Sequence, residues 1–171
     1  MSFALNQGPA REALLAYAPI VCNPDEAARC SAWLGLTDAS ENLQRTLGRE
    51  LALHDLSEDG FSLLAQLTLC EPNAVRPDDL GPALGLGRTA TANLLGRLEV
   101  SGLILHERAG REQPESGLRL TAAGRKIFTQ ALKSHLAAIL HAMSTLDSAD
   151  ITLIDRTCKR LRPPLPSAPT L

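Results

Sequence analysis

The spacing of apolar side chains along the chain predicts helices almost throughout, with one short β-hairpin among them. The most informative stretch covers residues 76–121. A short helix begins there at Pro77, because proline at the first helical position loses no hydrogen bond. Its apolar residues have the spacing of one helical face and are Leu80, Ala83 and Leu84. The sequence Gly-Leu-Gly at 85–87 then predicts a tight turn, since glycine accepts a positive φ.

A second helix is predicted over residues 88–100, and its two faces differ in chemistry. The apolar residues that share one face are Ala90, Leu94, Leu95 and Leu98. The polar residues that we place on the exposed face are Arg88, Thr89, Thr91, Asn93 and Arg97. Gly102 marks the end of this helix, as glycine often does just past a helix end.

Two short strands complete the stretch. They are predicted at 103–107 and 118–120, with a polar hairpin tip at 110–117. Helix, turn, helix and hairpin form the winged helix-turn-helix plan, in which the second helix can enter the DNA major groove. We therefore assign base-edge contacts to Arg88, Thr89, Thr91 and Asn93. Arg97 supports the fold or touches phosphate, and Arg108 and Arg111 on the wing contact phosphate or serve only solubility.

Helices also precede this stretch. Residues 9–17 predict a short helix that Pro19 stops, and Asn-Pro at 23–24 predicts the start of a long helix running to about residue 54. Gly35 and the Thr-Asp pair at 37–38 are positions where that helix could break or restart. Its recurring apolar residues are Trp33, Leu36, Leu43, Leu47 and Leu51.

Three further helices are predicted from their capping residues. Ser57 caps a helix over 58–69, Thr121 caps one over 122–146, and Ser148 caps one over 149–161. The helix after Thr121 has a wide apolar stripe made of Ile127, Phe128, Leu132, Leu136, Ile139, Leu140 and Met143. The flanking helices have more apolar surface than a small winged helix can cover, which predicts a two-fold homodimer interface.

The predicted fold is therefore mainly α: a winged helix-turn-helix with a small β-hairpin wing, flanked by N- and C-terminal helices that form a dimer interface. We divide the chain into an N-terminal extension at 1–30, a winged-helix DNA-binding domain at 56–121, and a helical dimerisation region at 31–55 and 122–162. The proline-rich segment 163–171 is predicted to be a disordered tail.

Composition limits the partners. Apolar residues make up 44% and aromatic residues 3%, so leucine and alanine must build the core. The net charge of −2 does not indicate a strong nonspecific DNA binder. Residues 86–121 contain five arginines against four acidic residues, which still allows a site to be read by a few placed arginines.

The titratable residues show no catalytic or metal-binding pattern. The four histidines lack ligand spacing, and no nucleophile-base arrangement or phosphate loop is present, so we expect no enzyme, cofactor or metal. The four cysteines have no CxxC pairing, and we find no signal peptide or membrane span, so we expect a cytoplasmic protein. Cys22 and Cys30 flank the start of the long helix, where a thiol can become reactive, and they are the candidates for redox sensing.

The segment LGLGRTATANLLGRLEVSGLILHERAGREQPESGLRLTAAGRKIF at 84–128 resembles the MarR family of bacterial transcription regulators. The matching motifs are Leu84-x-Leu86, Leu94-Leu95-x-Arg97-Leu98-Glu99, Gly102-Leu103-Ile104 and Leu118-x-Leu120-Thr121-x-x-Gly124. The likeness covers roughly residues 32–162. It implies a homodimer on palindromic double-stranded DNA, with a recognition helix at 88–100 and a wing at 109–117.

The resemblance also implies that a small anionic or aromatic ligand, or thiol oxidation, releases DNA. Candidate residues for the lining of a ligand pocket between the dimer helices and the winged helix are Trp33, Arg49, His54 and Phe61. The alternative for these four residues is ordinary core or surface.

Two positions depart from the family pattern. The wing tip usually has an Asp-x-Arg pair, but Glu-Gln-Pro stands at 112–114, so Arg111 is the candidate substitute. Asn93 stands where the recognition helix often has a basic residue. Three alternatives to a DNA-binding repressor therefore stay open: a protein-interaction module with the same dimeric fold, a thiol-based redox sensor of the same family, and a small enzyme.

Overall fold

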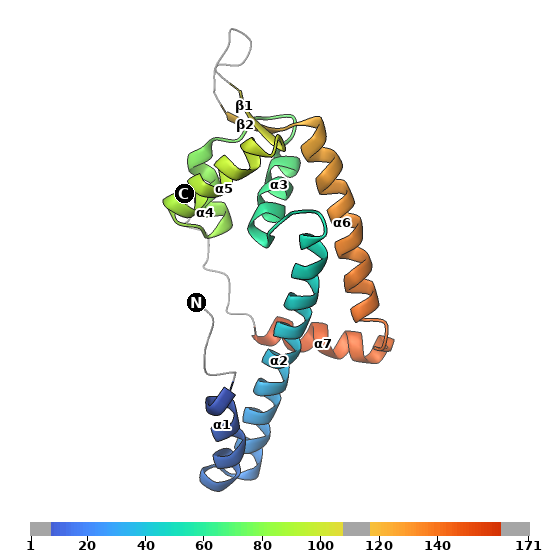
Figure 1. Ribbon diagram of the computed structural model, residues 1–171. Coiled ribbons are helices and arrows are strands. Elements are labelled where there is room, and N and C mark those ends of the chain that lie inside the picture. Colours follow the sequence, from blue (N-terminus) through green and yellow to red (C-terminus); the bar gives the residue numbers. More distant parts are fainter. Residues whose placement is uncertain (1–7, 108–116, 162–171) are drawn as a thin grey trace, which may run out of the picture.

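The computed structural model describes residues 8–107 and 117–161. Within these segments, seven helices and one hairpin follow in the order α1 (Gly8–Val21), α2 (Pro24–Ala52), α3 (Glu58–Cys70), α4 (Pro77–Leu84), α5 (Arg88–Val100), β1 (Ile104–Glu107), β2 (Gly117–Leu120), α6 (Ala122–Ala142) and α7 (Ser148–Leu161). The middle elements, α3 to β2, form a cluster at one end of the molecule; α2 extends from it to α1 at the other end, and α6 extends to α7 at the level of the middle of α2 (Figure 1). This arrangement confirms the predicted mainly α fold with a winged helix-turn-helix.

One leucine-rich core holds the winged helix together. Leu63, Leu64 and Leu67 of α3 are almost fully buried, together with Leu80 of α4 and Leu118 of β2. Each such leucine contributes about 1.5–3 kcal/mol on leaving water. Leu94 and Leu98 of α5 join the same cluster, as do Ile104, Leu120 and Phe128. The core therefore fixes the orientation of α5 relative to the hairpin.

The wing is an antiparallel pair with a short third partner. Ile104 pairs with Leu120, and Glu107 with Gly117. Val75, just before α4, exchanges backbone hydrogen bonds of 3.1 and 2.8 Å with Leu118. The base of the hairpin is thereby tied to the start of the helix-turn-helix.

The helix caps follow the sequence prediction with one exception. The Ser57 and Thr121 hydroxyl oxygens accept hydrogen bonds from the N–H groups of Gly60 and Gly124, at 3.1 and 2.9 Å. The predicted cap at Ser148 is wrong. Asp147 caps α7 instead, because its carboxylate accepts from the N–H groups of the next turn at 2.8 Å.

Two predicted interruptions of the N-terminal helices are also wrong. Pro19 lies inside α1, which continues for two more residues to Val21, so the proline does not stop the helix. The long helix α2 is continuous through Gly35, Thr37 and Asp38. The Thr37 hydroxyl donates back to carbonyls of its own helix, and the Asp38 carboxylate pairs with Arg11 of α1.

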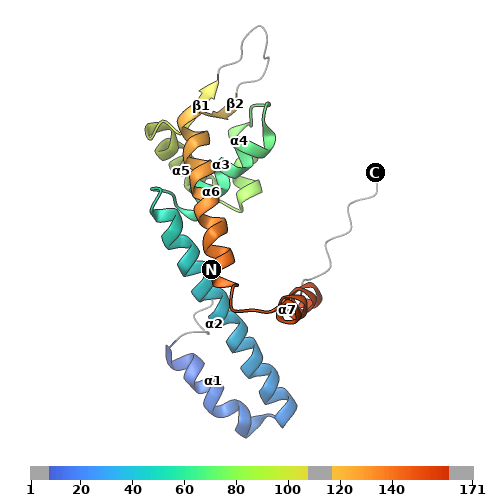
Figure 2. The ribbon, with the colours of Figure 1, turned by 90° about the vertical axis from the view of Figure 1, so that its right-hand side faces the viewer.

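The helices outside the winged helix leave much apolar surface uncovered. Trp33, Leu36 and Leu43 form an exposed stripe on α2. α7 packs extensively against no other element of the described chain and lies apart from α2 when the molecule is turned (Figure 2). α2 runs without interruption across the boundary we placed between residues 30 and 31. No described helix is long and apolar enough to cross a membrane.

Candidate nucleic-acid interface

The turn between α4 and α5 fixes where the exposed face of α5 begins. Gly85 ends α4 in the left-handed conformation, with φ of 67°, and the N–H of Leu86 donates to the carbonyl of Gly81 at 2.9 Å. Gly87 is the N-cap of α5, so Arg88 is the first helical residue. Both predicted helices and the glycine turn are confirmed.

Thr91 lies on the buried face of α5 and not on the exposed face to which we assigned it. It was predicted to be exposed, but its side chain is only 6% exposed, and its hydroxyl donates to the carbonyl of Gly87 at 3.1 Å. Gly81 makes this packing possible, since a Cβ there would lie 3.0 Å from the Thr91 hydroxyl oxygen. Thr91 is therefore a packing residue at the α4–α5 contact and not part of the exposed face of α5.

Ala90 lies on the exposed face of α5 and not on the buried face to which we assigned it. It was predicted to be in the core, yet it is exposed, as is Ala92. The buried residues of α5 are Thr91, Leu94 and Leu98. The buried face therefore contains Thr91 at the place where we predicted Ala90. Ala90 and Ala92 thus join the accessible face, where a methyl side chain can contact the methyl group of thymine.

Arg88, Thr89 and Asn93 lie on the exposed face as predicted. Arg88 has no hydrogen bond or ion pair with any residue in the described segments, so its five donors are available to a partner. Arg76 differs, because it donates to Asp79 at 3.0 Å and lowers the pKa of that carboxyl below its ordinary value. Arg119 of β2 pairs with Glu107 across the hairpin.

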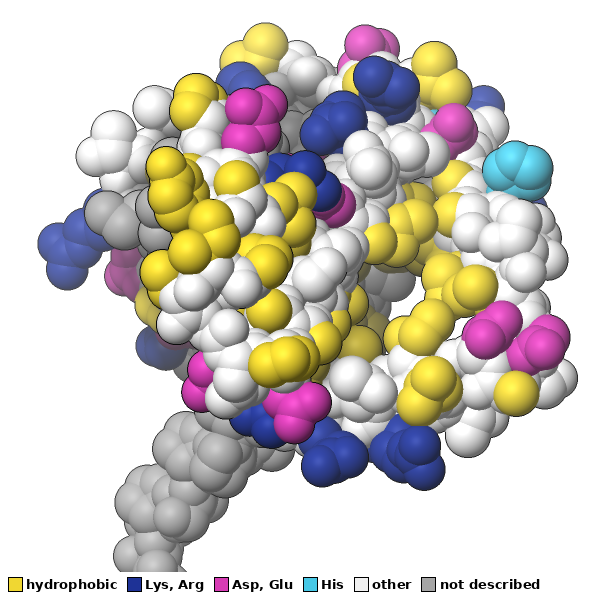
Figure 3. Space-filling view, turned by 90° about the horizontal axis from the view of Figure 1, so that it is seen from below, with side chains coloured by type: hydrophobic (Ala, Val, Ile, Leu, Met, Phe, Trp, Pro, Cys, Tyr) yellow, Lys and Arg dark blue, Asp and Glu magenta, His cyan; other side chains and the backbone are white. Residues whose placement is uncertain are grey.

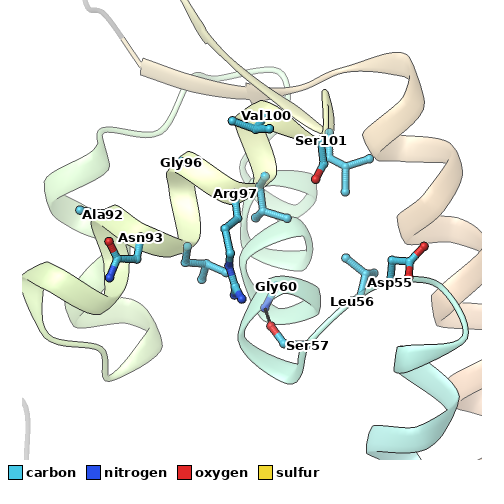
Figure 4. Close-up of a pocket in the computed structure, with 13 residues that line it drawn as sticks. Asp55, Leu56, Ser57, Gly60, Ala92, Asn93, Gly96, Arg97, Val100 and Ser101 are labelled. Carbon is cyan, nitrogen blue, oxygen red and sulfur yellow. Dashed lines mark hydrogen bonds between the residues drawn. The ribbon is translucent and has the colours of Figure 1, made fainter.

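Arg97 points away from the tip of the recognition helix. Its side chain extends toward Ser57 and Gly60 in the first turn of α3 (Figure 4). An open hollow of about 630 Å³ lies here, lined by α5, the α3 N-terminus and Asp55. The guanidinium and the positive end of the α3 dipole favour an anion, whereas the carboxylates of Asp55, Glu58 and Asp59 around the α3 N-terminus oppose one. Arg108 and Arg111 lie outside the described residues.

The four candidate residues for the ligand pocket do not line one cavity within a single chain. Trp33 is 47% exposed on α2, about 30 Å along the helix axis from His54. Arg49 lies at a shallow hollow with Glu58. Only His54 and Phe61 lie at the junction of α2, α3 and α6.

That junction contains two polar residues that sequence reasoning missed. His54 Nε2 lies 2.9 Å from the hydroxyl oxygen of Ser134, and the ring of Phe61 lies 5.3 Å from that of His135. The Nδ1 atom of His135 is buried and has no hydrogen-bond partner among the residues that the structure describes. No sequence signal marks Ser134 and His135, because they were assigned only to a helix with an apolar stripe.

The two candidate cysteines are brought together at the α1–α2 turn. Cys22 and Cys30 line the same apolar hollow beside α1. The pKa of the Cys22 thiol is raised, by desolvation first and then by Cys30 and Glu26. The thiol is therefore protonated at neutral pH, which disfavours the reactive thiolate that the position at the helix N-terminus suggested.

We expect Cys22 to react slowly with iodoacetamide at pH 8, more slowly than in the chain unfolded by urea. The thiolate is the reactive form, and a raised pKa lowers its fraction at any pH below that pKa. In the Cys30→Ala and Glu26→Gln variants the pH at half-maximal rate should fall, since each change removes a cause of the shift. Mass spectrometry of the modified peptides gives the rate at Cys22 alone. An unchanged pH profile in both variants would contradict the assignment of these causes.

Comparison with solved structures identifies the fold. The chain is similar to MepR, a transcription regulator of the Staphylococcus aureus multidrug efflux pump MepA, with 17% identity and a TM-score of 0.64 over 74% of this chain and 92% of that one. It is similar to a mutant MarR from Escherichia coli complexed with operator DNA, with 16% identity and a TM-score of 0.62 over 86% and 98%. A Mycobacterium tuberculosis MarR family protein in complex with DNA gives 20% identity and a TM-score of 0.58 over 75% and 94%.

No family model matches the sequence, and no curated protein is significantly similar to it. The structural likenesses confirm that the chain has the fold of the MarR-family regulators. At these identities they establish the fold alone.

Proposed function

We propose that the chain is a DNA-binding transcription regulator that binds a palindromic operator as a homodimer and represses transcription by occupying it. The observation that carries the proposal is the exposed face of α5. There Arg88, which pairs with no residue of the described segments, stands beside Thr89, two alanines and Asn93, at the helix start that contacts bases in such folds. Two solved structures of the same fold contain DNA, which agrees with this use of the helix.

The uncovered apolar surface argues for the dimer. On α7, Ile151 and Ile154 are 48% and 41% exposed on one helical face. Leu136 and Leu140 at the end of α6 are 50% and 72% exposed. Together with the α2 stripe, these are apolar faces that the described part of a single chain leaves in water. A two-fold partner would cover them and hold two α5 helices for successive major grooves, about 34–36 Å apart.

Arg88→Ala should remove most of the sequence preference of DNA binding. A bidentate arginine-guanine contact contributes about 1–3 kcal/mol of discrimination, so the ratio of specific to nonspecific affinity should fall by about 5- to 150-fold. The measurement is a mobility shift on DNA upstream of the gene that encodes the chain, under reducing conditions, with a scrambled competitor. Arg111→Ala, if it contacts phosphate, should weaken binding to both DNAs alike.

Arg45→Ala is the matched control, because Arg45 is exposed on α2, away from α5, and donates a hydrogen bond to Asn42 of its own helix. It should leave both affinities unchanged. The proposal fails if the wild type gives no salt-sensitive, site-specific shift. Equal behaviour of Arg88→Ala and Arg111→Ala would refute the separate roles assigned to them.

A protein-interaction module is the second candidate function, favoured by the charge around the helix-turn-helix. Residues 76–107 contain three arginines against four acidic residues, which gives little attraction to phosphate. In that case the wild type would be dimeric yet retain no DNA at low salt.

We also propose that a small ligand or an oxidant releases the DNA. The junction of His54, Ser134, His135 and Phe61 is the place we favour for a ligand, since it lies between the long helices and the winged helix. The protonated Cys22 makes an oxidant the weaker choice.

A further inference from the structure

The first helix, α1, is too apolar for the environment it has in one chain. Among its 14 residues only Arg11 and Glu12 are charged, and none is buried. A helix that is apolar on all sides is normally covered by other protein. A helix of this length is also marginal in water on its own, so its stability must come from packing.

In the single chain, α1 is covered on one side only. It packs against α2, where Arg11 pairs with Asp38. Tyr17, Ile20 and Val21 are 62%, 74% and 76% exposed. These three residues share one face, since they are three and four positions apart. An apolar groove of about 480 Å³ runs beside this face, with almost no polar surface among its lining residues.

The one other helix of the described chain with a strongly amphipathic and unpartnered face is α7. Its apolar residues Ile151, Ile154, Cys158 and Leu161 follow helical spacing, and all but Cys158 are exposed. α1 lies at the end of the molecule away from the wing, whereas α7 lies at the level of the middle of α2 (Figure 1). Seen from that end, hydrophobic side chains gather over the α1–α2 hairpin beside a hollow that separates it from α7 (Figure 3). The two helices therefore do not cover each other within one chain.

The charges of the two regions are opposite. The hairpin segment 8–38 contains four acidic residues against two arginines, and Asp25 and Glu26 stand in the first turn of α2. The helix α7 contains Arg156, Lys159 and Arg160 against Asp150 and Asp155, and Lys159 pairs with Asp155. The net negative charge of the hairpin segment and the small net positive charge of α7 complement each other.

We propose that the groove on α1 receives the apolar face of α7 from a second copy of the chain. By two-fold symmetry each α7 lies in the partner's groove, so the contact forms twice per dimer. The proposal rests on the proposed dimer and assigns a role to the N-terminal extension, which the winged-helix plan leaves unexplained.

The test is a double-mutant cycle on the dimer dissociation constant, measured by sedimentation of the full chain. The α1 variant is Tyr17→Ala/Ile20→Ala, and the α7 variant is Ile151→Ala/Ile154→Ala; alanine keeps both helices stable. We expect the α1 variant to raise the dissociation constant at least tenfold. We also expect the dissociation constant of the combined variant to rise at least fivefold less than the product of the two separate increases. The effects should not multiply, because both variants remove the same contact.

Leu69→Ala is the control, since Leu69 is 82% exposed on α3 and lies outside both regions. It should not change the dissociation constant. Circular dichroism of each variant shows whether α1 and α7 remain helical. The fluorescence emission of Trp33, the single tryptophan, provides a second measurement of dimer dissociation. Trp33 is exposed on α2, so its emission should change when the dimer dissociates.

The outcomes separate this inference from the proposed function. A wild type that is monomeric at every accessible concentration overturns the dimer itself. A dimeric wild type whose dissociation constant is unchanged by the α1 variant overturns only the role of α1. Effects of the two variants that multiply without coupling would show that α1 contacts a surface other than α7, which also overturns the inference.

Discussion

Replacing Gly124 with alanine should lower the free energy of unfolding by about 3 kcal/mol or more. A Cβ on Gly124 would overlap the carbonyl oxygen of Leu103 and lie 2.9 Å from its carbonyl carbon. Overpacking typically costs about 1–3 kcal/mol, and here the obstacle is backbone, which cannot rotate away. For a chain of this size, 3 kcal/mol corresponds to a fall in Tm of roughly 6–12 °C.

The contact is rigid because hydrogen bonds hold it on both sides. The N–H of Thr121 donates to the Leu103 carbonyl at 3.1 Å, and the Thr121 hydroxyl donates to the carbonyl of Gly102 at 2.7 Å. The N–H of Gly124 in turn donates to that same hydroxyl oxygen at 2.9 Å. The start of α6 is thus fixed to the segment between α5 and β1. Moving the two backbones apart to make room for a Cβ would break these three hydrogen bonds.

Gly96→Ala provides the matched control for this prediction. Gly96 also lies within a helix, α5, but a Cβ there would meet nothing within 4 Å. Alanine should therefore stabilise the chain by about 0.5–1 kcal/mol through helix propensity. Urea unfolding at one fixed protein concentration compares the two variants. Equal unfolding midpoints for Gly124→Ala and the wild type would refute the overlap.

The second large effect should come from Ile151→Asp/Ile154→Asp, which we expect to make the chain monomeric and to reduce operator affinity at least 100-fold. Burial of an isoleucine contributes about 1.5–3 kcal/mol, and the two-fold dimer would lose four of them. Each aspartate would in addition bring a carboxylate into an apolar interface, which is costly unless the charge is paired. A monomer can contact only one half-site, so the affinity gained from the second α5 is lost.

Leu153→Asp tests whether the dimer depends on the face of α7 that contains Ile151 and Ile154, or on any exposed apolar residue of this helix. Leu153 is 52% exposed on a different side of α7. It should leave the dimer largely intact, as measured by sedimentation, and it should retain operator binding in a mobility shift. A monomeric double variant with undiminished operator affinity would contradict the link between dimerisation and DNA binding.

The sequence was most informative where local rules act alone. Pro77, the glycines at 85–87 and the caps at Ser57 and Thr121 set helix ends through one or two backbone groups, and the structure confirms them. It was least informative where two elements meet. Burial of Thr91 depends on the missing side chain of Gly81 in another helix, and periodicity within α5 cannot reveal that.

The candidate site shows the same division. The exposed Arg88 and Asn93 follow from the spacing of α5, whereas the proximity of His54 to Ser134 depends on how α2 and α6 pair across 80 positions. The continuity of α2 past Gly35 was missed for a related reason. Propensity at single residues predicted a break, but an ion pair from α1 to Asp38 and packing against α6 favour the helix.

The unbroken length of α2 has a mechanical consequence. Its 29 residues make a rod roughly 44 Å long at 1.5 Å per residue. Rotation of such a rod by ~5° about one end displaces the other end by roughly 4 Å, by the same rise per residue. A displacement of that size is a sizeable fraction of the width of a major groove, about 12 Å. In the proposed dimer, a small angular change where α1 meets α2 would therefore change the distance between the two α5 helices.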